Sequence, residues 1–262
     1  MTYLNQNTIR SVTFISFCLL VLWLIGLGWS VGEYYAGKPE KIPEASIHSN
    51  IKEDKNEILV VALGDSLTRG TGDETGKGYV GALVDEMKDK SNQSVKLTNL
   101  GINGQTSEQL RKQVQEIEIQ RQLQTADYIL LTIGGNDLFR GGQGIEDLEA
   151  KAELEGIETT YLKNIEFILK QIRQVNKQGT IFFIGLYNPF IDLAEGEEVS
   201  KIVRRWNYMS AEVSASFSKI VFVPTFDLFE LKVNDYLYTD KFHPNTMGYR
   251  LIAERVAALL TW

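Results

Sequence analysis

The segment Ile58-Leu-Val-Val-Ala-Leu-Gly-Asp-Ser-Leu67 gives the first indication of the fold class. Its first six residues form an apolar run rich in β-branched side chains, which is typical of a strand buried on both faces. The run ends at Gly64, Asp65 and Ser66, residue types that favour a turn into a following helix. A buried strand that leads directly into a helix is the repeating unit of sheets with parallel strands.

Four further apolar runs continue this pattern along the chain, at residues 95–100, 128–133, 180–186 and 220–223. Segments with helical spacing lie between them. The clearest one places six apolar residues on a single helical face: Leu162, Ile165, Ile168, Leu169, Ile172 and Val175. The alternation predicts an α/β fold, a three-layer α/β/α sandwich around a mostly five-stranded parallel sheet. Ligands of such sheets bind beyond the carboxyl ends of the strands.

The last helical segment has its own start signal. Ile252, Val256, Leu259 and Leu260 share one face, and Asn245 or Thr246 is a candidate N-cap. The residues ahead of this helix come from the loop that follows the fifth predicted strand. We therefore expect them to lie at the same edge of the sheet as Ser66.

The amino-terminal part of the chain has a different composition. After a tail of residues 1–10, residues 11–32 carry no charge and are strongly apolar. A run of roughly 20 such residues is long enough to cross a bilayer as a helix. Residues 33–56 contain Gly37, Pro39, Pro43 and many charges, which predicts a flexible stalk. The remaining residues, 57–262, are the predicted globular domain.

The apolar run has two interpretations. It is longer than the usual apolar region of a signal peptide, and no clean cleavage site follows it, so an uncleaved transmembrane anchor is the preferred interpretation. The short tail favours a location with the tail inside the cell and the domain outside the cytoplasm. The alternative is a cleaved signal peptide and a secreted domain.

Composition excludes several function classes. The net charge of −7 and the pI near 5.1 argue against a nucleic-acid partner, which requires a basic face. Cys18 is the single cysteine, so the chain forms no intramolecular disulfide. The two histidines are His48, in the predicted stalk, and His243. These residues form no zinc-binding pattern, and we expect neither a metal nor another cofactor.

Nucleophilic chemistry is the best interpretation of the polar residues at the strand ends. Ser66 follows the first predicted strand, where its hydroxyl can point into the crevice. A serine needs a base within hydrogen-bond reach, and His243 is the one histidine in the predicted domain. Asp240 lies three residues before His243, a spacing at which a carboxylate can reach the imidazole and fix its tautomer.

Hydrogen-bond donors for an oxyanion are expected after the second and third strands. The segments are Asn99-Leu-Gly-Ile-Asn-Gly104-Gln-Thr106 and Gly134-Gly-Asn-Asp137. Glycine allows the backbone to approach a ligand closely, and the amide of Asn136 donates without titrating.

A glycine-rich segment after Ser66 suggests a phosphate-binding loop but does not match one. In Gly70-Thr-Gly-Asp-Glu-Thr-Gly-Lys-Gly78, the glycines at 72 and 76 are too close together, and Gly78 stands where Ser or Thr is required. The dinucleotide-binding pattern also fails, because Thr75 replaces its third glycine. The chain has no Gly-x-Ser-x-Gly elbow either, which excludes an ordinary α/β-hydrolase.

Four of these segments resemble the sequence blocks of the SGNH/GDSL lipase and esterase family, in the family's order. They are Gly64-Asp-Ser-Leu67, Gly104, Gly134-Gly-Asn-Asp137 and Asp240-x-x-His243. The resemblance covers residues 57–262 and implies a flavodoxin-like SGNH-hydrolase fold.

The resemblance also implies roles for individual residues. Ser66 would be the nucleophile, and His243 with Asp240 would complete the catalytic triad. The oxyanion hole would consist of the N–H groups of Ser66 and Gly104 and the side-chain amide of Asn136.

The implied activity is that of a serine esterase or acylhydrolase that cleaves carboxylic esters through an acyl-enzyme. Lipid, lysophospholipid or other acyl esters are the expected substrates, and O-acetyl esters of cell-wall or other carbohydrates are the alternative. A non-catalytic cell-surface binding module is the alternative from a different class. The sequence does not predict the oligomeric state. Trp206, Tyr208 and Phe190 are expected in the core, although an acyl groove or a sugar platform is an alternative.

Overall fold

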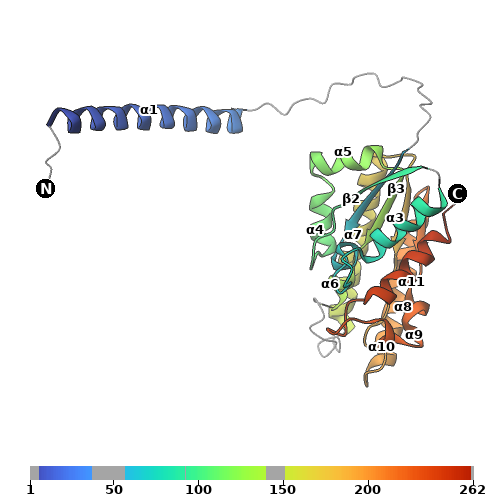
Figure 1. Ribbon diagram of the computed structural model, residues 1–262. Coiled ribbons are helices and arrows are strands. Elements are labelled where there is room, and N and C mark those ends of the chain that lie inside the picture. The colour runs from blue at the N-terminus through green and yellow to red at the C-terminus, as the bar shows by residue number, and fades with distance from the viewer. Residues whose placement is uncertain (1–5, 37–56, 92, 140–150, 261–262) are drawn as a thin grey trace. The chain divides into compact units, whose positions relative to one another are not determined.

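The computed structural model describes residues 6–36, 57–91, 93–139 and 151–260. The chain divides into two units, Met1–Glu53 and Asp54–Trp262. The described residues of the first unit form one helix, α1 (Gln6–Ala36; Figure 1). This helix includes residues 33–36, which the sequence predicted as the start of a stalk; residues 37–56, with His48, lie outside the described ranges.

The described residues contain no helix that combines the length and the hydropathy of a membrane span. The transmembrane segment predicted at residues 11–32 therefore gains no support from the structure.

The second unit is built on a five-stranded sheet with strand order β2-β1-β3-β4-β5. All neighbouring strands are parallel. The strands are β1 (Glu57–Gly64), β2 (Ser94–Asn99), β3 (Tyr128–Thr132), β4 (Thr180–Ile184) and β5 (Ile220–Val223). The predicted five-stranded parallel sheet is thus confirmed.

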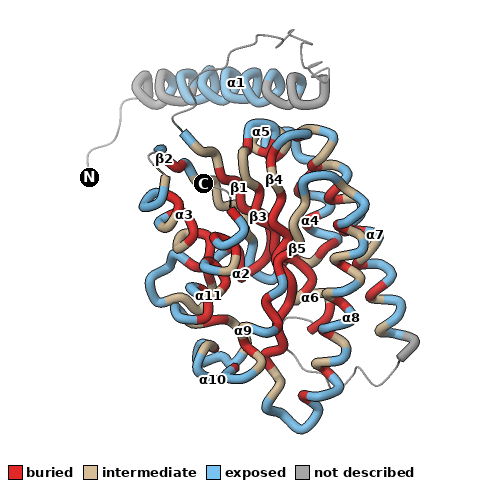
Figure 2. The backbone as a smooth tube through the Cα atoms, turned by 90° about the vertical axis from the view of Figure 1, so that its right-hand side faces the viewer, coloured by how far each residue is buried: buried red, intermediate tan, exposed pale blue. Residues whose placement is uncertain are grey.

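Helices cover both faces of this sheet, as Figures 1 and 2 show. Val61 and Leu63 of β1 pack on one side, whereas Val60 and Ala62 pack on the other, because successive side chains of a strand point to opposite faces. The first side is covered by α4 (Ser107–Gln113), α5 (Ile117–Thr125), α7 (Lys151–Val175) and α8 (Gly196–Ala215). The second is covered by α3 (Gly78–Lys90), α9 (Phe226–Glu230) and α11 (Thr246–Ala257).

The inner strands β1, β3 and β4 are mostly buried between the two helical layers, and short helices lie at the carboxyl edge of the sheet (Figure 2). These are α2 (Ser66–Arg69), which follows β1, α6 (Gly135–Phe139), which follows β3, and α10 (Val233–Tyr236). The loops at this edge contain the residues to which the sequence assigned chemistry.

The two predicted helical faces have different outcomes. In α7, Ile165, Ile168, Leu169 and Ile172 are fully buried in the core, as their spacing predicted. The last helix starts after Asn245, whose side chain accepts a hydrogen bond from the N–H of Gly248, but it ends at Ala257. Leu259 follows that end and is 42% exposed, so its predicted place on one helical face with Ile252 and Val256 is wrong.

Candidate active site

The strand order places a topological switch point beside β1. The chain leaves β1 toward β2 on one side and continues through β3, β4 and β5 on the other. Connections that diverge in this way leave a crevice at the carboxyl ends of the two central strands. Ser66 directly follows β1, and Asn136 follows β3, so both residues border this crevice.

Ser66 is the first residue of α2 and is 5% exposed. Asp65 is the N-cap, and its Oδ1 accepts the N–H of Leu67 at 3.0 Å. The first N–H groups of a helix have no acceptor inside the helix, so the N–H of Ser66 is available to a ligand. The turn therefore presents both the hydroxyl and the N–H of Ser66 at the carboxyl edge.

His243 and Asp240 complete a hydrogen-bonded chain with Ser66. His243 Nε2 lies 2.8 Å from Ser66 Oγ, and His243 Nδ1 lies 2.7 Å from Asp240 Oδ2. The second carboxylate oxygen of Asp240 accepts the backbone N–H groups of Phe242 and His243, each at 3.0 Å. The structure thus brings together three residues that are up to 177 positions apart in the sequence.

The state of Asp240 determines the tautomer of the imidazole. Burial acts to raise the pKa of Asp240, but the hydrogen bonds from the His243 ring and from the N–H groups of Phe242 and His243 outweigh it, and the pKa lies below its ordinary value. An ionised carboxylate only accepts hydrogen bonds, so Nδ1 of His243 carries a proton. In the neutral ring, Nε2 then presents its lone pair to the hydroxyl of Ser66.

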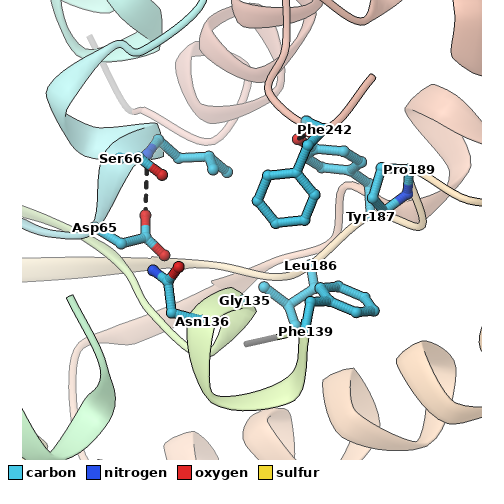
Figure 3. A pocket seen from close by; sticks show the side chains of 10 residues that line it. Asp65, Ser66, Gly135, Asn136, Phe139, Leu186, Tyr187, Pro189 and Phe242 are labelled. Atoms are coloured by element: carbon cyan, nitrogen blue, oxygen red, sulfur yellow. Dashed lines mark hydrogen bonds between the residues drawn. The ribbon is translucent and has the colours of Figure 1, made fainter. Parts of the chain in front are cut away.

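Asn136 is held with its amide at the crevice. Its Nδ2 donates to the carbonyl oxygen of Gln105 at 3.0 Å. An amide nitrogen has two N–H donors, so this bond orients the group while one donor stays available. Figure 3 shows Asn136 and Ser66 at the same pocket.

Gly104 lies in an exposed turn next to this contact. The N–H of Gln105 donates to the carbonyl oxygen of Ile102 at 3.1 Å, and Gly104 has a φ of 74°. A positive φ at this position of a tight turn favours glycine. Gly104 is outside the lining of the pocket, and its link to the site is the neighbouring Gln105, which binds Asn136.

Asp137 connects the same two segments, a role that sequence reasoning missed. Its carboxylate accepts the N–H of Ser107 at 2.9 Å and the hydroxyl of Ser107 at 2.5 Å. The side chain of Asn164 in α7 then donates to the Ser107 hydroxyl at 3.0 Å. Burial raises the pKa of Asp137, although the bonds from Ser107 partly offset this effect. These hydrogen bonds therefore link the segment that contains Gly104 to the segment that contains Asn136, and link both to α7.

Asp65 is a second carboxylate whose environment the sequence did not reveal. It is 2% exposed and accepts the hydroxyl of Thr132 at 2.8 Å, in addition to the N–H of Leu67. Burial raises the pKa of Asp65, and the bonds from Thr132 and Leu67 counteract only part of that shift. Thr68 binds Thr132 at 2.7 Å, so a buried polar chain joins α2 to β3.

A pocket with largely apolar walls opens beside Ser66 (Figure 3). Phe139 and Phe242 make an edge-to-face contact with ring centroids 6.1 Å apart, and Phe190 makes another with Phe139 at 5.3 Å. Tyr187 donates a hydrogen bond from its hydroxyl to the carbonyl oxygen of Phe242. This bond links the pocket wall to the segment that carries His243. The pocket is lined by Asp65, Ser66, Leu67, Gly135, Asn136, Phe139, Leu186, Tyr187, Pro189 and Phe242.

The aromatic residues that the sequence grouped together separate in the structure. Trp206 is 1% exposed and stacks on Tyr161 at 4.2 Å, which makes it a core residue as expected. Tyr208 is 61% exposed, so its expected place in the core is wrong. Phe190 contacts the aromatic wall of the pocket.

Comparison with known proteins supports the same chemistry. A sequence model of the GDSL-like Lipase/Acylhydrolase family matches residues 62–251, which include all five predicted site residues. The chain belongs to this family. Among curated proteins, the chain is similar to YpmR, an uncharacterized protein of Bacillus subtilis (strain 168), with 36% identity over 207 residues, or 77% of this chain and 81% of YpmR.

Two further relatives of this GDSL-like chain are named as lipases. The spore germination lipase LipC of Bacillus licheniformis is 27% identical over 208 residues, or 77% of this chain and 95% of LipC. The crystal structure of the lipase Lip_vut3 from a goat rumen metagenome matches with a TM-score of 0.70 at 26% identity. That match covers 77% of this chain and 96% of Lip_vut3.

Proposed function

We propose that the chain is a serine-dependent carboxylic-ester hydrolase that forms an acyl-enzyme at Ser66. The observation that supports this most directly is the hydrogen-bonded chain from Ser66 through His243 to Asp240, with distances of 2.8 and 2.7 Å, at the mouth of an apolar pocket. A serine, a base and a group that orients the base are the requirements of nucleophilic acyl transfer.

The geometry fits a two-step reaction. Ser66 Oγ attacks the ester carbonyl while His243 Nε2 takes its proton, and Asp240 stabilises the imidazolium that forms. The carbonyl oxygen becomes negative, and the N–H of Ser66 and the amide of Asn136 donate to it, with Gly104 as the third proposed donor. His243 returns the proton to the leaving alcohol. Water, deprotonated by the same histidine, then releases the acid and restores Ser66.

We place the substrate among esters with an apolar acyl group, such as lipid, lysophospholipid or other acyl esters. The walls formed by Phe139, Leu186 and Phe242 suit an aliphatic chain, and they offer few partners for the hydroxyl groups of a sugar. The likeness to LipC over 95% of its length favours the same substrate class. O-acetyl esters of carbohydrates are the alternative with identical chemistry at Ser66.

A series of p-nitrophenyl esters tests this substrate class. Each methylene buried on binding contributes roughly 0.8 kcal/mol, so kcat/KM is expected to rise about tenfold from acetate to butyrate. A maximum at acetate, together with release of acetate from acetylated xylo-oligosaccharides, would favour the carbohydrate esterase. Hydrolysis of none of these esters would favour a binding module.

We further propose, from the uncharged residues 11–32, that the hydrolase domain is tethered to a membrane outside the cytoplasm. The full-length chain is then expected in the membrane fraction, with the domain accessible to protease added to intact cells. Deletion of residues 1–35 should release active protein. Recovery from the medium of a chain that lacks residues 1–35 would instead identify a cleaved signal peptide, and recovery of the intact chain in the soluble fraction would refute the tether.

A further inference from the structure

The glycine-rich segment that follows Ser66 packs against His243 and the residue after it, Pro244. Gly72 has a φ of 92°. A Cβ atom at this position would lie 2.7 Å from the carbonyl oxygen of Pro244 and 3.1 Å from Cβ of His243. A side chain therefore has no room here, and glycine allows the backbone after α2 to contact the backbone that carries His243.

The next residue, Asp73, forms a cluster of hydrogen bonds that extends to Thr246, at the start of α11. Within its own loop, its carboxylate accepts the N–H groups of Thr75, Lys77 and Gly78 and the hydroxyl of Thr75. A fifth donor comes from the far segment, because the hydroxyl of Thr246 binds Asp73 Oδ1 at 2.6 Å. Thr246 is the first residue of α11 and lies three positions after His243.

The charge of Asp73 makes this contact strong. Its partial burial acts to raise the pKa, but the bonds from Thr246, Thr75 and Gly78 outweigh burial and lower the pKa to about 2. The carboxylate is therefore ionised at neutral pH, and hydrogen bonds to an ionised acceptor are shorter and stronger than neutral ones.

A third contact, in the interior, joins the glycine-rich segment to α11. The hydroxyl of Tyr249, a residue of α11 that is 1% exposed, donates to the carbonyl oxygen of Thr71 at 2.7 Å. Residues 71, 72 and 73 thus each touch the segment from His243 to Tyr249. The same three residues follow the helix that carries Ser66, so they connect the two partners of the 2.8 Å hydrogen bond.

We propose that residues 71–73 are a positioning element that holds His243 at proton-transfer distance from Ser66. The solvent-exposed hydrogen bond between Asp73 and Thr246 is one of the contacts by which this element binds the His243 segment. The inference rests on the proposed function of Ser66 and His243. It assigns the glycine-rich segment a task in place of the phosphate binding that its sequence excluded. Proton transfer needs the base within hydrogen-bond reach, and a displacement of about 1 Å can cost up to 10²-fold in rate.

Three variants of the full-length chain test the positioning role. Thr246→Val keeps the shape but removes the donor to Asp73, and it is expected to lower kcat roughly tenfold with an unchanged KM. Thr246→Ser restores the hydroxyl and should restore kcat. Thr75→Val is the matched control, because it removes a hydroxyl that donates to the same carboxylate at 2.7 Å without touching the His243 segment. The control should keep the wild-type kcat. Equal kcat values in Thr246→Val and Thr75→Val would overturn the proposal.

A second measurement needs no turnover and separates this inference from the proposed function. The chain has two histidines, so the ring signals of His243 can be assigned by nuclear magnetic resonance with His48→Gln. In Thr246→Val the His243 signals should shift or broaden, and in Thr246→Ser and Thr75→Val they should match those of the wild type. Unchanged His243 signals in Thr246→Val would refute the positioning element even if the wild type hydrolyses no ester. If neither the wild type nor any variant hydrolyses an ester but the His243 signals shift as expected, the proposed esterase function is refuted and the positioning element is not.

Discussion

Ser66→Ala is expected to lower kcat for ester hydrolysis by about 10⁴- to 10⁶-fold, the usual cost of removing a catalytic nucleophile. The variant loses the oxygen that forms the acyl-enzyme, and His243 then has no hydroxyl to deprotonate. Folding should change little. Ser66 is the first residue of α2, and its N-cap Asp65 keeps both hydrogen bonds to Leu67 and Thr132. The free energy of unfolding should therefore change by about 1 kcal/mol or less.

Steady-state kinetics and thermal melts of the same preparations measure both expectations. Ser91→Ala is a suitable control, because Ser91 caps the end of α3 through a hydrogen bond to Met87 and lies outside the pocket. Mass spectrometry after rapid quenching should find the acyl group on the peptide that contains Ser66, and no acylated peptide in the variant. Retention of more than a tenth of the wild-type activity by Ser66→Ala would refute the nucleophile.

Removing the amide of Asn136 is expected to lower kcat by about 10²- to 10³-fold, or roughly 3–4 kcal/mol, with little change in KM. The hydrogen bond to the oxyanion is strongest when the negative charge on oxygen is greatest. Asn136→Ala removes the donor. Asn136→Asp keeps the shape but places a negative charge beside the oxyanion and against the carbonyl oxygen of Gln105, which accepts the amide in the wild type. The Asp variant should therefore be at least as slow as the Ala variant.

The competing interpretation is that Asn136 only shapes the backbone at the start of α6, where the chain turns after β3. Both variants would then lose activity in step with stability, and Asp, a good turn residue, would be the milder change. Kinetics at saturating substrate, together with melting temperatures, separates the two interpretations. A kcat in Asn136→Asp close to that of the wild type would remove Asn136 from the proposed oxyanion hole.

The sheet was predictable because its strands are contiguous apolar runs, but the exact strand ends depend on distant residues. The fourth run was predicted to continue to Leu186, whereas β4 ends at Ile184. The side chain of Asn207 in α8 binds both the N–H and the carbonyl oxygen of Leu186, at 2.8 and 2.7 Å. These bonds take the place of backbone hydrogen bonds to a neighbouring strand. No sequence pattern near residue 186 indicates that an asparagine 21 positions away will bind it.

The grouping of Ser66, Asp240 and His243 was predictable for a related reason. Loops after parallel strands meet at one edge, so polar residues at strand ends converge even when the sequence separates them. The contacts that hold these residues were not predictable. Asp73 and Thr246 are 173 positions apart, and the partly buried pair of Asp137 and Ser107 joins the starts of α6 and α4, which share no local signal.

The order of the site's segments along the chain has a consequence for synthesis. Ser66 follows the first strand of the domain, whereas Asp240 and His243 directly precede the last helix, α11. A serine without its base is a weak nucleophile. Under the proposed mechanism, a nascent polypeptide is therefore inert until the segment with Asp240 and His243 has left the ribosome, and so is any fragment truncated before residue 240. Hydrolytic activity arises only after all five strands of the sheet have been synthesised, which protects nearby esters from a half-made domain.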